Sequence, residues 1–144
     1  MTRLPVLFLL GVALASASAE TLTINVTTEC PREGVIAILV FKDKKGFPNK
    51  DDQAFLKARF PVTEAGAISC MVTNLPYGEY SLSVLHDIND NYKADKMLGF
   101  GPPKEPIGFS NLDKKVRKQP KFKDTLFTFD SENTAIEVPL FYVF

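Results

Sequence analysis

A period of two in the apolar residues is the feature that most constrains this chain. Leu22, Ile24 and Val26 alternate with polar side chains, which is the pattern of a strand with one buried face. No segment shows a strong helical period. The sequence therefore predicts an all-β domain, an antiparallel β-sandwich of about seven strands with one long ordered loop. The strand pattern occurs in segments 21–27, 35–41, 67–73, 80–84, 124–130 and 134–144.

Two of these segments can be placed within a sheet. Val35–Phe41 is a continuous apolar run rich in β-branched residues, which predicts a central strand covered on both faces. Pro139 lacks the N–H group that a strand ladder needs, so we expect the segment 134–144 at a sheet edge.

The stretches between the segments predict two local connections. The turn residues 74–78 lie between 67–73 and 80–84, and this arrangement predicts that the two segments form a hairpin. The charged stretch 42–53 is expected to be a loop, with a short helical turn near Asp52–Ala58.

The first nineteen residues have the pattern of a cleavable signal peptide. Arg3 precedes the apolar run Leu4–Leu14, and Ala17-Ser18-Ala19 is a small-residue cleavage site. The apolar run is too short for a membrane span, and no other stretch approaches the ~20 apolar residues that a span needs. We expect a signal peptide at 1–19, one domain at 20–144, no transmembrane segment, and a secreted or periplasmic protein.

Charge and cysteine content narrow the class of protein. The 144 residues contain 17 basic and 17 acidic side chains, and this balance argues against nucleic acid as a partner. Export would place Cys30 and Cys70 in an oxidising compartment, where a pair of cysteines usually forms a disulfide. We predict a Cys30–Cys70 bridge, and the alternative is two buried free thiols.

The segment after the strand pattern at 80–84 is dense in oxygen-bearing side chains and has the spacing of a calcium loop. Tyr92 and Leu98 depart from that motif, because it has Gly and a bidentate Glu at their positions. Two interpretations stay open, a weak calcium site and a polar turn whose side chains bond to their own backbone. The candidate calcium ligands are Asp87, Asn89, Asn91, Lys93 through its carbonyl, and Asp95.

The residue inventory gives little support to an enzyme. His86 is the single histidine, and Ser83 lies three residues before it on the same predicted strand, so their side chains leave opposite faces. The sequence has no phosphate loop, dinucleotide fingerprint or zinc spacing. We predict no catalytic residues. The alternative is a carboxylate-based hydrolase or carbohydrate-active enzyme that uses Asp87 and Asp95.

The segment from Lys93 to Lys121 shows no strand or helix period, yet it is too apolar for a solvated tail. We predict an ordered loop, and we expect residues 87–123 to bind an extracellular protein or glycan. The alternative for the basic run within it is a solvated loop face. The expected binding residues are two aromatic anchors and four basic side chains: Phe100, Phe109, Lys114, Lys115, Arg117 and Lys118.

A combination of motifs resembles the bacterial secreted family known as domain of unknown function 2141. The resemblance covers most of 20–142 and implies an exported β-sandwich, similar to transthyretin-like and carboxypeptidase-regulatory-like modules, with no established activity. Tyr92 stands where that family usually has Gly, which bears on the geometry of the turn. The matching residues are His86-Asp87-Ile88-Asn89-Asp90-Asn91, Lys93, Asp95, Gly99, Pro102, Glu105, Gly108-Phe109-Ser110-Asn111, Gly46-Phe47-Pro48, Leu75-Pro76, Gly78 and Tyr80.

Overall fold

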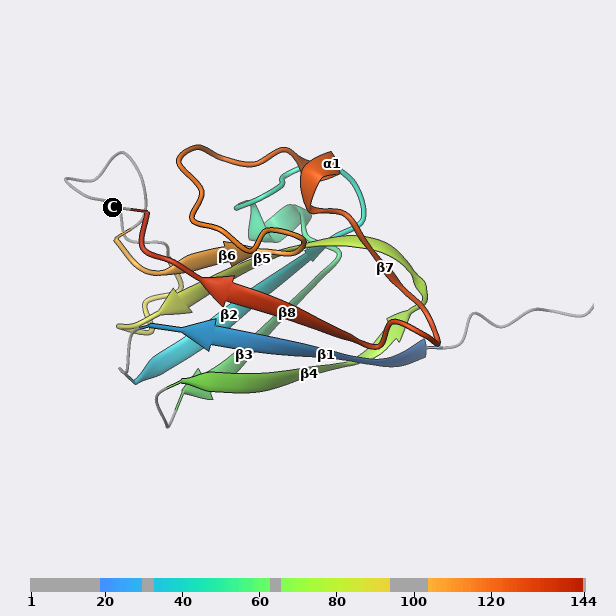
Figure 1. The fold of residues 1–144 in the computed structure, drawn as a ribbon, viewed down its shortest axis with the longest axis horizontal. Helices are drawn as coiled ribbons and strands as arrows, with labels where there is room; N and C mark the ends of the chain where they lie inside the picture. Colours follow the sequence, from blue (N-terminus) through green and yellow to red (C-terminus); the bar gives the residue numbers. More distant parts are fainter. Residues whose placement is uncertain (1–18, 30–32, 63–65, 94–103, 144) are drawn as a thin grey trace, which may run out of the picture.

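Two sheets packed face to face form the protein in this computed structural model, which describes residues 19–29, 33–62, 66–93 and 104–143 (Figure 1). Within those residues eight strands form one sheet of three and one of five. The predicted β-sandwich is confirmed. The expected signal peptide falls almost wholly on residues 1–18, which lie outside the described residues.

The smaller sheet has the order β4 (Ala67–Pro76), β1 (Ala19–Thr28), β8 (Ala135–Leu140). The alternation that predicted β1 is confirmed, because Leu22, Ile24 and Val26 are fully buried. β4 runs antiparallel to β1, whereas β8 runs parallel to it, so this one pair departs from the expected antiparallel pairing. A parallel pair needs a crossover connection, and β8 enters this sheet from the other one. As predicted for Pro139, β8 lies at an edge.

The larger sheet has the order β3 (Leu56–Val62), β2 (Gly34–Phe41), β5 (Gly78–Asp87), β6 (Ile107–Phe109), and β7 (Phe127–Phe129) pairs with the start of β5. β2 is a central strand, as predicted. Its outer face, however, is only half-buried at Val35, Ala37 and Leu39. The outer face of β2 is therefore only partly covered, whereas full cover of both faces was expected.

The core lies between the two sheets, and every long strand contributes alternate side chains to it. Burial of these apolar groups is the main favourable term in the folding free energy. Its largest fully buried members are Tyr80, Phe129, Leu22, Ile24, Ile36, Ile38, Leu75, Leu82 and Leu140.

The predicted hairpin of β4 and β5 is wrong, because the two strands belong to different sheets. The turn residues 74–78 carry the chain across the edge of the sandwich. Leu75 and Tyr80 are both buried at this crossing. The Tyr80 hydroxyl donates a 2.6 Å hydrogen bond to the Pro76 carbonyl. Turn signals mark a reversal of the chain, but they do not decide which sheet the next strand joins.

β3 was not predicted. Its residues Leu56, Ala58 and Phe60 point inward and pack against the core. The period of two is therefore present, but charged residues and a proline lie between these apolar positions. The expected helical turn is a 3-10 helix, η1 (Asp51–Gln53), and it ends before β3 begins. The other described helix is α1 (Phe122–Thr125). Neither is long enough to cross a membrane.

The two sheets join along one side of the sandwich. Ile107 in β6 exchanges two backbone hydrogen bonds with Phe141, of 3.0 and 2.9 Å, just beyond the end of β8. Gly108 permits this approach, because a Cβ atom there would lie 2.4 Å from the Pro139 carbonyl oxygen. This junction fixes where the loop after β6 begins.

Candidate functional site: a basic surface beside a shallow groove

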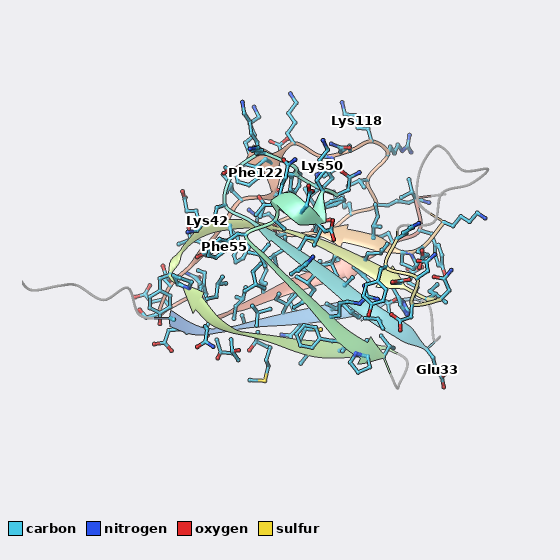
Figure 2. The ribbon with its side chains drawn as sticks, turned by 180° about the vertical axis from the view of Figure 1, so that it is seen from behind. Glu33, Lys42, Lys50, Phe55, Lys118 and Phe122 are labelled. Carbon is cyan, nitrogen blue, oxygen red and sulfur yellow. The ribbon has the colours of Figure 1, made fainter. Side chains whose placement is uncertain are left out.

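Two loops that are distant in the sequence meet at one end of the molecule, and we name their exposed face the basic surface. They are residues 42–53 and 111–124, and Figure 2 shows Lys50, Lys118 and Phe122 together at that end with Glu33 at the other. The loops contain ten Lys or Arg and five Asp or Glu residues, whereas the whole chain is balanced. Positive charge is therefore concentrated at this end, and the rest of the chain has an acidic excess.

An aromatic cluster holds the two loops together. The ring of Phe47 lies at its centre, with ring centroids of Phe41, Phe109 and Phe122 at 5.4, 6.0 and 5.8 Å. These rings cover one end of the outer face of the larger sheet, next to Ser81. The cluster is thus a second, smaller core beneath the basic surface.

Buried hydroxyl groups anchor the longer loop to β5. Ser110 Oγ accepts a 2.8 Å hydrogen bond from the Leu82 N–H and donates to the Thr125 carbonyl. The Thr125 hydroxyl lies 2.8 Å from Ser81 Oγ, and these three hydroxyl side chains are fully buried. Both ends of the loop are fixed to the sheet, as expected for an ordered loop.

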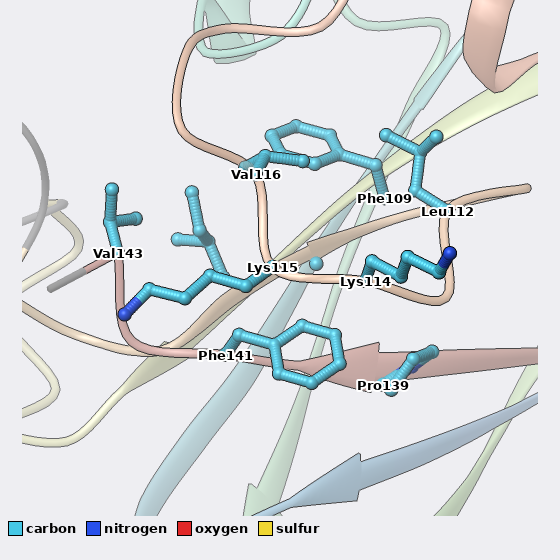
Figure 3. A pocket seen from close by; sticks show the side chains of 10 residues that line it. Phe109, Leu112, Lys114, Lys115, Val116, Pro139, Phe141 and Val143 are labelled. Carbon is cyan, nitrogen blue, oxygen red and sulfur yellow. The ribbon is translucent and has the colours of Figure 1, made fainter.

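A shallow groove runs beside the basic surface, between β6, the loop after it and the end of β8 (Figure 3). It contains about 230 Å³ of space, part of which is open solvent. The ammonium groups of Lys114 and Lys115 point toward opposite ends of the groove in Figure 3. The other lining residues are mostly apolar: Ile107, Gly108, Phe109, Leu112, Val116, Pro139, Phe141 and Val143.

The predicted binding residues differ in their exposure to solvent. Lys114, Lys115, Arg117 and Lys118 are all exposed, and none of them forms an ion pair with a described residue. Phe109 is only 5% exposed and belongs to the aromatic cluster, so the expectation that it is an exposed anchor was wrong. Ser83 of β5 lies opposite Phe109 of β6, so the two side chains share one face of the larger sheet. On that face the two loops cover the Phe109 ring. Phe100 lies outside the described residues.

The candidate calcium loop begins at Asp87, whose carboxylate is fully buried at the end of β5. One oxygen accepts a hydrogen bond from the Asn91 N–H, of 3.2 Å, and the other accepts one from the Tyr92 N–H, of 2.9 Å. Asn91 Oδ1 in turn accepts the Lys93 N–H at 3.0 Å. These are the bonds of a polar turn, in which the side chains bond to their own backbone.

Arg59 supplies the positive charge beside this turn. Its guanidinium lies 2.8 Å from the Asp87 carboxylate and 2.6 Å from that of Asp90, and it covers the Tyr92 ring at 3.8 Å. Partial burial opposes the charge on Arg59, but the hydrogen bonds to Asp87 and Asp90 outweigh this effect and raise its pKa. Tyr92 and Asp90 have positive φ angles, of 64° and 52°, which few non-glycine residues adopt.

The structure leaves the calcium prediction untested. Asn89 lies in the described turn, and Asp95 lies outside the described residues. In the described part of the chain, no three His, Cys, Asp or Glu side chains are grouped as metal ligands. Glu105, a second buried carboxylate near the turn, accepts a 2.7 Å hydrogen bond from the Ile88 N–H.

His86 is buried in the core, on the opposite face of β5 from Ser83. Its ring nitrogens lie 3.4 Å from the Thr28 hydroxyl and 3.4 Å from the Glu33 carbonyl. Burial lowers the pKa of His86 below its ordinary value, and the Glu33 carbonyl and the Asp87 charge only partly oppose this. The imidazole is therefore a neutral core group at pH 7.

Cys70 is a free thiol with a fully buried side chain, which contradicts the predicted disulfide. Cys30 lies outside the described residues. In the register of the two strands, Ile24 of β1 lies opposite Cys70. Burial also raises the Cys70 pKa to about 11.

Sequence reasoning missed two contributors to this region. Only a loop is expected at residues 42–53, although the charge pattern of the lysines at 42–50 is visible in the sequence. Arg59 was also missed, because its contact with Asp87 depends on two strands that flank β2. No local pattern reports such a contact.

The comparisons with known proteins give a single family. No curated protein matches this chain, and no solved structure matches it either. A family model described as an uncharacterized protein conserved in bacteria, domain of unknown function 2141, matches residues 24–137. Because this match spans most of the chain, and the buried turn and anchored loop lie within it, the protein belongs to that family.

Proposed function

We propose that this protein is an exported, non-enzymatic module that binds an acidic glycan through the basic surface. The observation that carries the proposal is the set of ten exposed basic side chains on two adjoining loops, none in an ion pair with a described residue. Basic side chains that have no acidic partner among the described residues can be neutralised by a polyanion. The mostly apolar residues that line the shallow groove would contact the rings of the glycan beside this surface.

The buried turn supports a structural role for the residues that an enzyme would need. Asp87 is fully buried and Glu105 is 4% exposed, and both carboxylates accept hydrogen bonds from backbone N–H groups. A general acid or base must reach its substrate. We therefore retain the non-enzymatic interpretation, in which these groups hold the loop. Calcium is not required by the proposal, because Arg59 already balances the charge of Asp87.

Retention on an immobilised sulfated polysaccharide, eluted with salt, tests the proposal. We compare the triple variant Lys114→Ala, Lys115→Ala, Lys118→Ala with a control of equal charge change, Lys57→Ala, Lys93→Ala, Lys104→Ala. The first set lies on the basic surface and the second outside it, and all six side chains are exposed. Stability should change by less than about 1 kcal/mol in both.

We expect the wild-type protein and the control to elute at similar salt concentrations, and the basic-surface variant to elute earlier. Salt should weaken binding by the wild-type protein, since exposed charges are screened. Equal elution of the two triple variants would assign retention to net charge alone. No retention of the wild-type protein at about 0.05 M salt would overturn the proposal.

A further inference from the structure

β4 presents an open row of backbone hydrogen-bonding groups. The Thr28 N–H donates to the Gly66 carbonyl at 3.4 Å, and the register continues with Ile24 opposite Cys70. In an antiparallel ladder, residues alternate between those bonded to the partner strand and those whose N–H and C=O point away from it. The register continues without a shift as far as Val72, so the residues that direct both groups away from β1 are Ala67, Ser69 and Met71.

The other edges of the sandwich carry protecting features. β3 contains Lys57, Arg59 and Pro61, and β8 contains Glu137 and Pro139. β6 and β7 are only three residues long. Charged residues, prolines and short lengths all prevent edge strands from pairing with another chain.

β4 has none of these protections along most of its length. Its ten residues include no charged side chain, and its proline is the last residue. The side chain of Met71 is 59% exposed at the middle of the strand. Methionine is flexible and packs well at contact surfaces. A long, uncharged edge with an exposed apolar side chain is an expected site of strand pairing.

We propose that β4 pairs with β4 of a second copy of this chain, antiparallel, about a two-fold axis at Ser69. The outward-directed residues are spaced symmetrically about that position, so Ser69 lies opposite Ser69 of the second copy and Ala67 lies opposite Met71. All three contribute to about six backbone hydrogen bonds. The two smaller sheets then form one continuous six-stranded sheet.

The uncharged sequence of β4 is suited to pairing with a second copy of itself. At a two-fold interface the same strand of both copies is brought together. Any charge on β4 would therefore lie close to the same charge on the second copy. The uncharged sequence of β4 avoids this repulsion. In Figure 1 the loops of the basic surface lie on the side of the molecule away from β4, so pairing leaves both basic surfaces free. The inference does not depend on the proposed function.

Sedimentation of the mature chain at increasing concentration, up to about 200 µM, tests this pairing. We expect a reversible dimer. Ser69→Lys and Met71→Lys each place two like charges at the interface and should raise the dissociation constant at least ~10-fold. Thr128→Lys is the matched control, because Thr128 is an exposed strand residue on β7. Each variant's melting temperature, measured at low concentration, reports whether it still folds.

Amide hydrogen exchange identifies the interface without relying on variants. We expect the N–H groups of Ala67, Ser69 and Met71 to exchange more slowly at high protein concentration, because pairing gives them backbone partners. Those of Ile68 and Cys70, which already face β1, should change less. A monomer at the highest concentration would overturn the proposal, as would a dimer that both lysine variants retain.

Discussion

At the scale of single residues, Asp87 shows how one buried carboxylate stabilises a turn. Its oxygens accept the N–H groups of Asn91 and Tyr92 and contact Arg59, which is itself about a quarter exposed. We predict that Asp87→Ala lowers the free energy of unfolding by about 3 kcal/mol, because it leaves buried donors and a positive charge without their partner. Urea denaturation measures the change.

Asp51→Ala is the matched control for this prediction. Asp51 pairs with Lys57 at 3.5 Å, and both side chains are about two-thirds exposed. Its removal should cost no more than about 0.5 kcal/mol, since solvent screens exposed pairs. Equal losses in the two variants would mean that the Asp87 contacts add nothing beyond a surface charge.

The variant Asp87→Ala also tests the calcium interpretation. With Arg59 bonded to Asp87 and Asp90, we expect about 10 mM Ca²⁺ to leave the melting temperature of the wild-type protein unchanged. A rise that Asp87→Ala abolishes would instead establish a weak calcium site, as the spacing of the oxygens predicted.

His86 should make stability depend on pH. Burial lowers its folded-state pKa, so the unfolded chain binds its proton more readily. Its contribution is fully present above the unfolded pKa of about 6.5 and is lost as the pH falls below that value. We predict that the free energy of unfolding falls between about pH 6.5 and 5.5, by up to about 1.4 kcal/mol per pH unit, and that His86→Gln flattens this slope. A slope unchanged in the variant would assign it to other groups.

Parity along each strand was enough to predict which residues are buried, and it was not enough to predict their partners. Leu22, Ile24 and Val26 are buried as their alternation predicted, because alternation in a strand is a local property. The bridge from Cys70 to Cys30 and the contact of Asp87 with Arg59 both depend on register between strands. Register is set by the packed sheets, so local sequence does not report it.

At the scale of elements, the close contact of β6 and β8 depends on a residue without a side chain. A Cβ atom at Gly108 would lie 2.4 Å from the Pro139 carbonyl oxygen and 2.7 Å from Leu140 Cδ2. We predict that Gly108→Ala separates the strands and lowers the free energy of unfolding by about 2 kcal/mol or more. Chemical denaturation measures the loss.

Gly78→Ala is the control for this contact. The nearest atoms to a Cβ at Gly78 lie 3.7 Å away, which is ordinary packing distance. Its free energy of unfolding should therefore stay within about 1 kcal/mol of the wild-type value. If Gly108→Ala were tolerated equally well, the junction between the sheets would have to be adaptable rather than closely packed.

Most strands were predictable, and their connections were less so. β1, β2 and β8 have clear apolar patterns that match their observed positions, whereas β6 is three residues long and lies within a segment rich in Gly and Pro. A strand this short forms because β5 and Phe141 pair with it, and its own sequence gives little signal. The hairpin prediction failed for a related reason, since the pairing of β4 depends on β1.

At the scale of the whole molecule, half of the basic surface could be read from the sequence. The run at 114–118 is contiguous and was predicted to bind. The contribution of residues 42–50 became evident only once the contact of Phe47 with Phe122 joined two loops some seventy positions apart in the chain. Charge that is dispersed in the sequence but adjacent in space is a property of the folded protein.

Cys70 offers a probe of how the whole sandwich unfolds. It is the fully buried thiol of β4, within the core that both sheets share, and its raised pKa of about 11 keeps it protonated. A thiol reagent attacks the thiolate, so Cys70 must become exposed before it can react. We predict that the free energy of opening from Cys70 labelling equals the global free energy of unfolding within about 0.5 kcal/mol.

Labelling at increasing urea, with the modified peptide identified by mass spectrometry, measures this opening. Met71→Cys is the control, because position 71 is on the exposed face of the same strand and should react without unfolding. Labelling of Cys70 well below the global transition would mean that β4 opens locally as an edge strand. A Cys70 that stays unlabelled in denaturant until reductant is added would contradict the free thiol and indicate a disulfide.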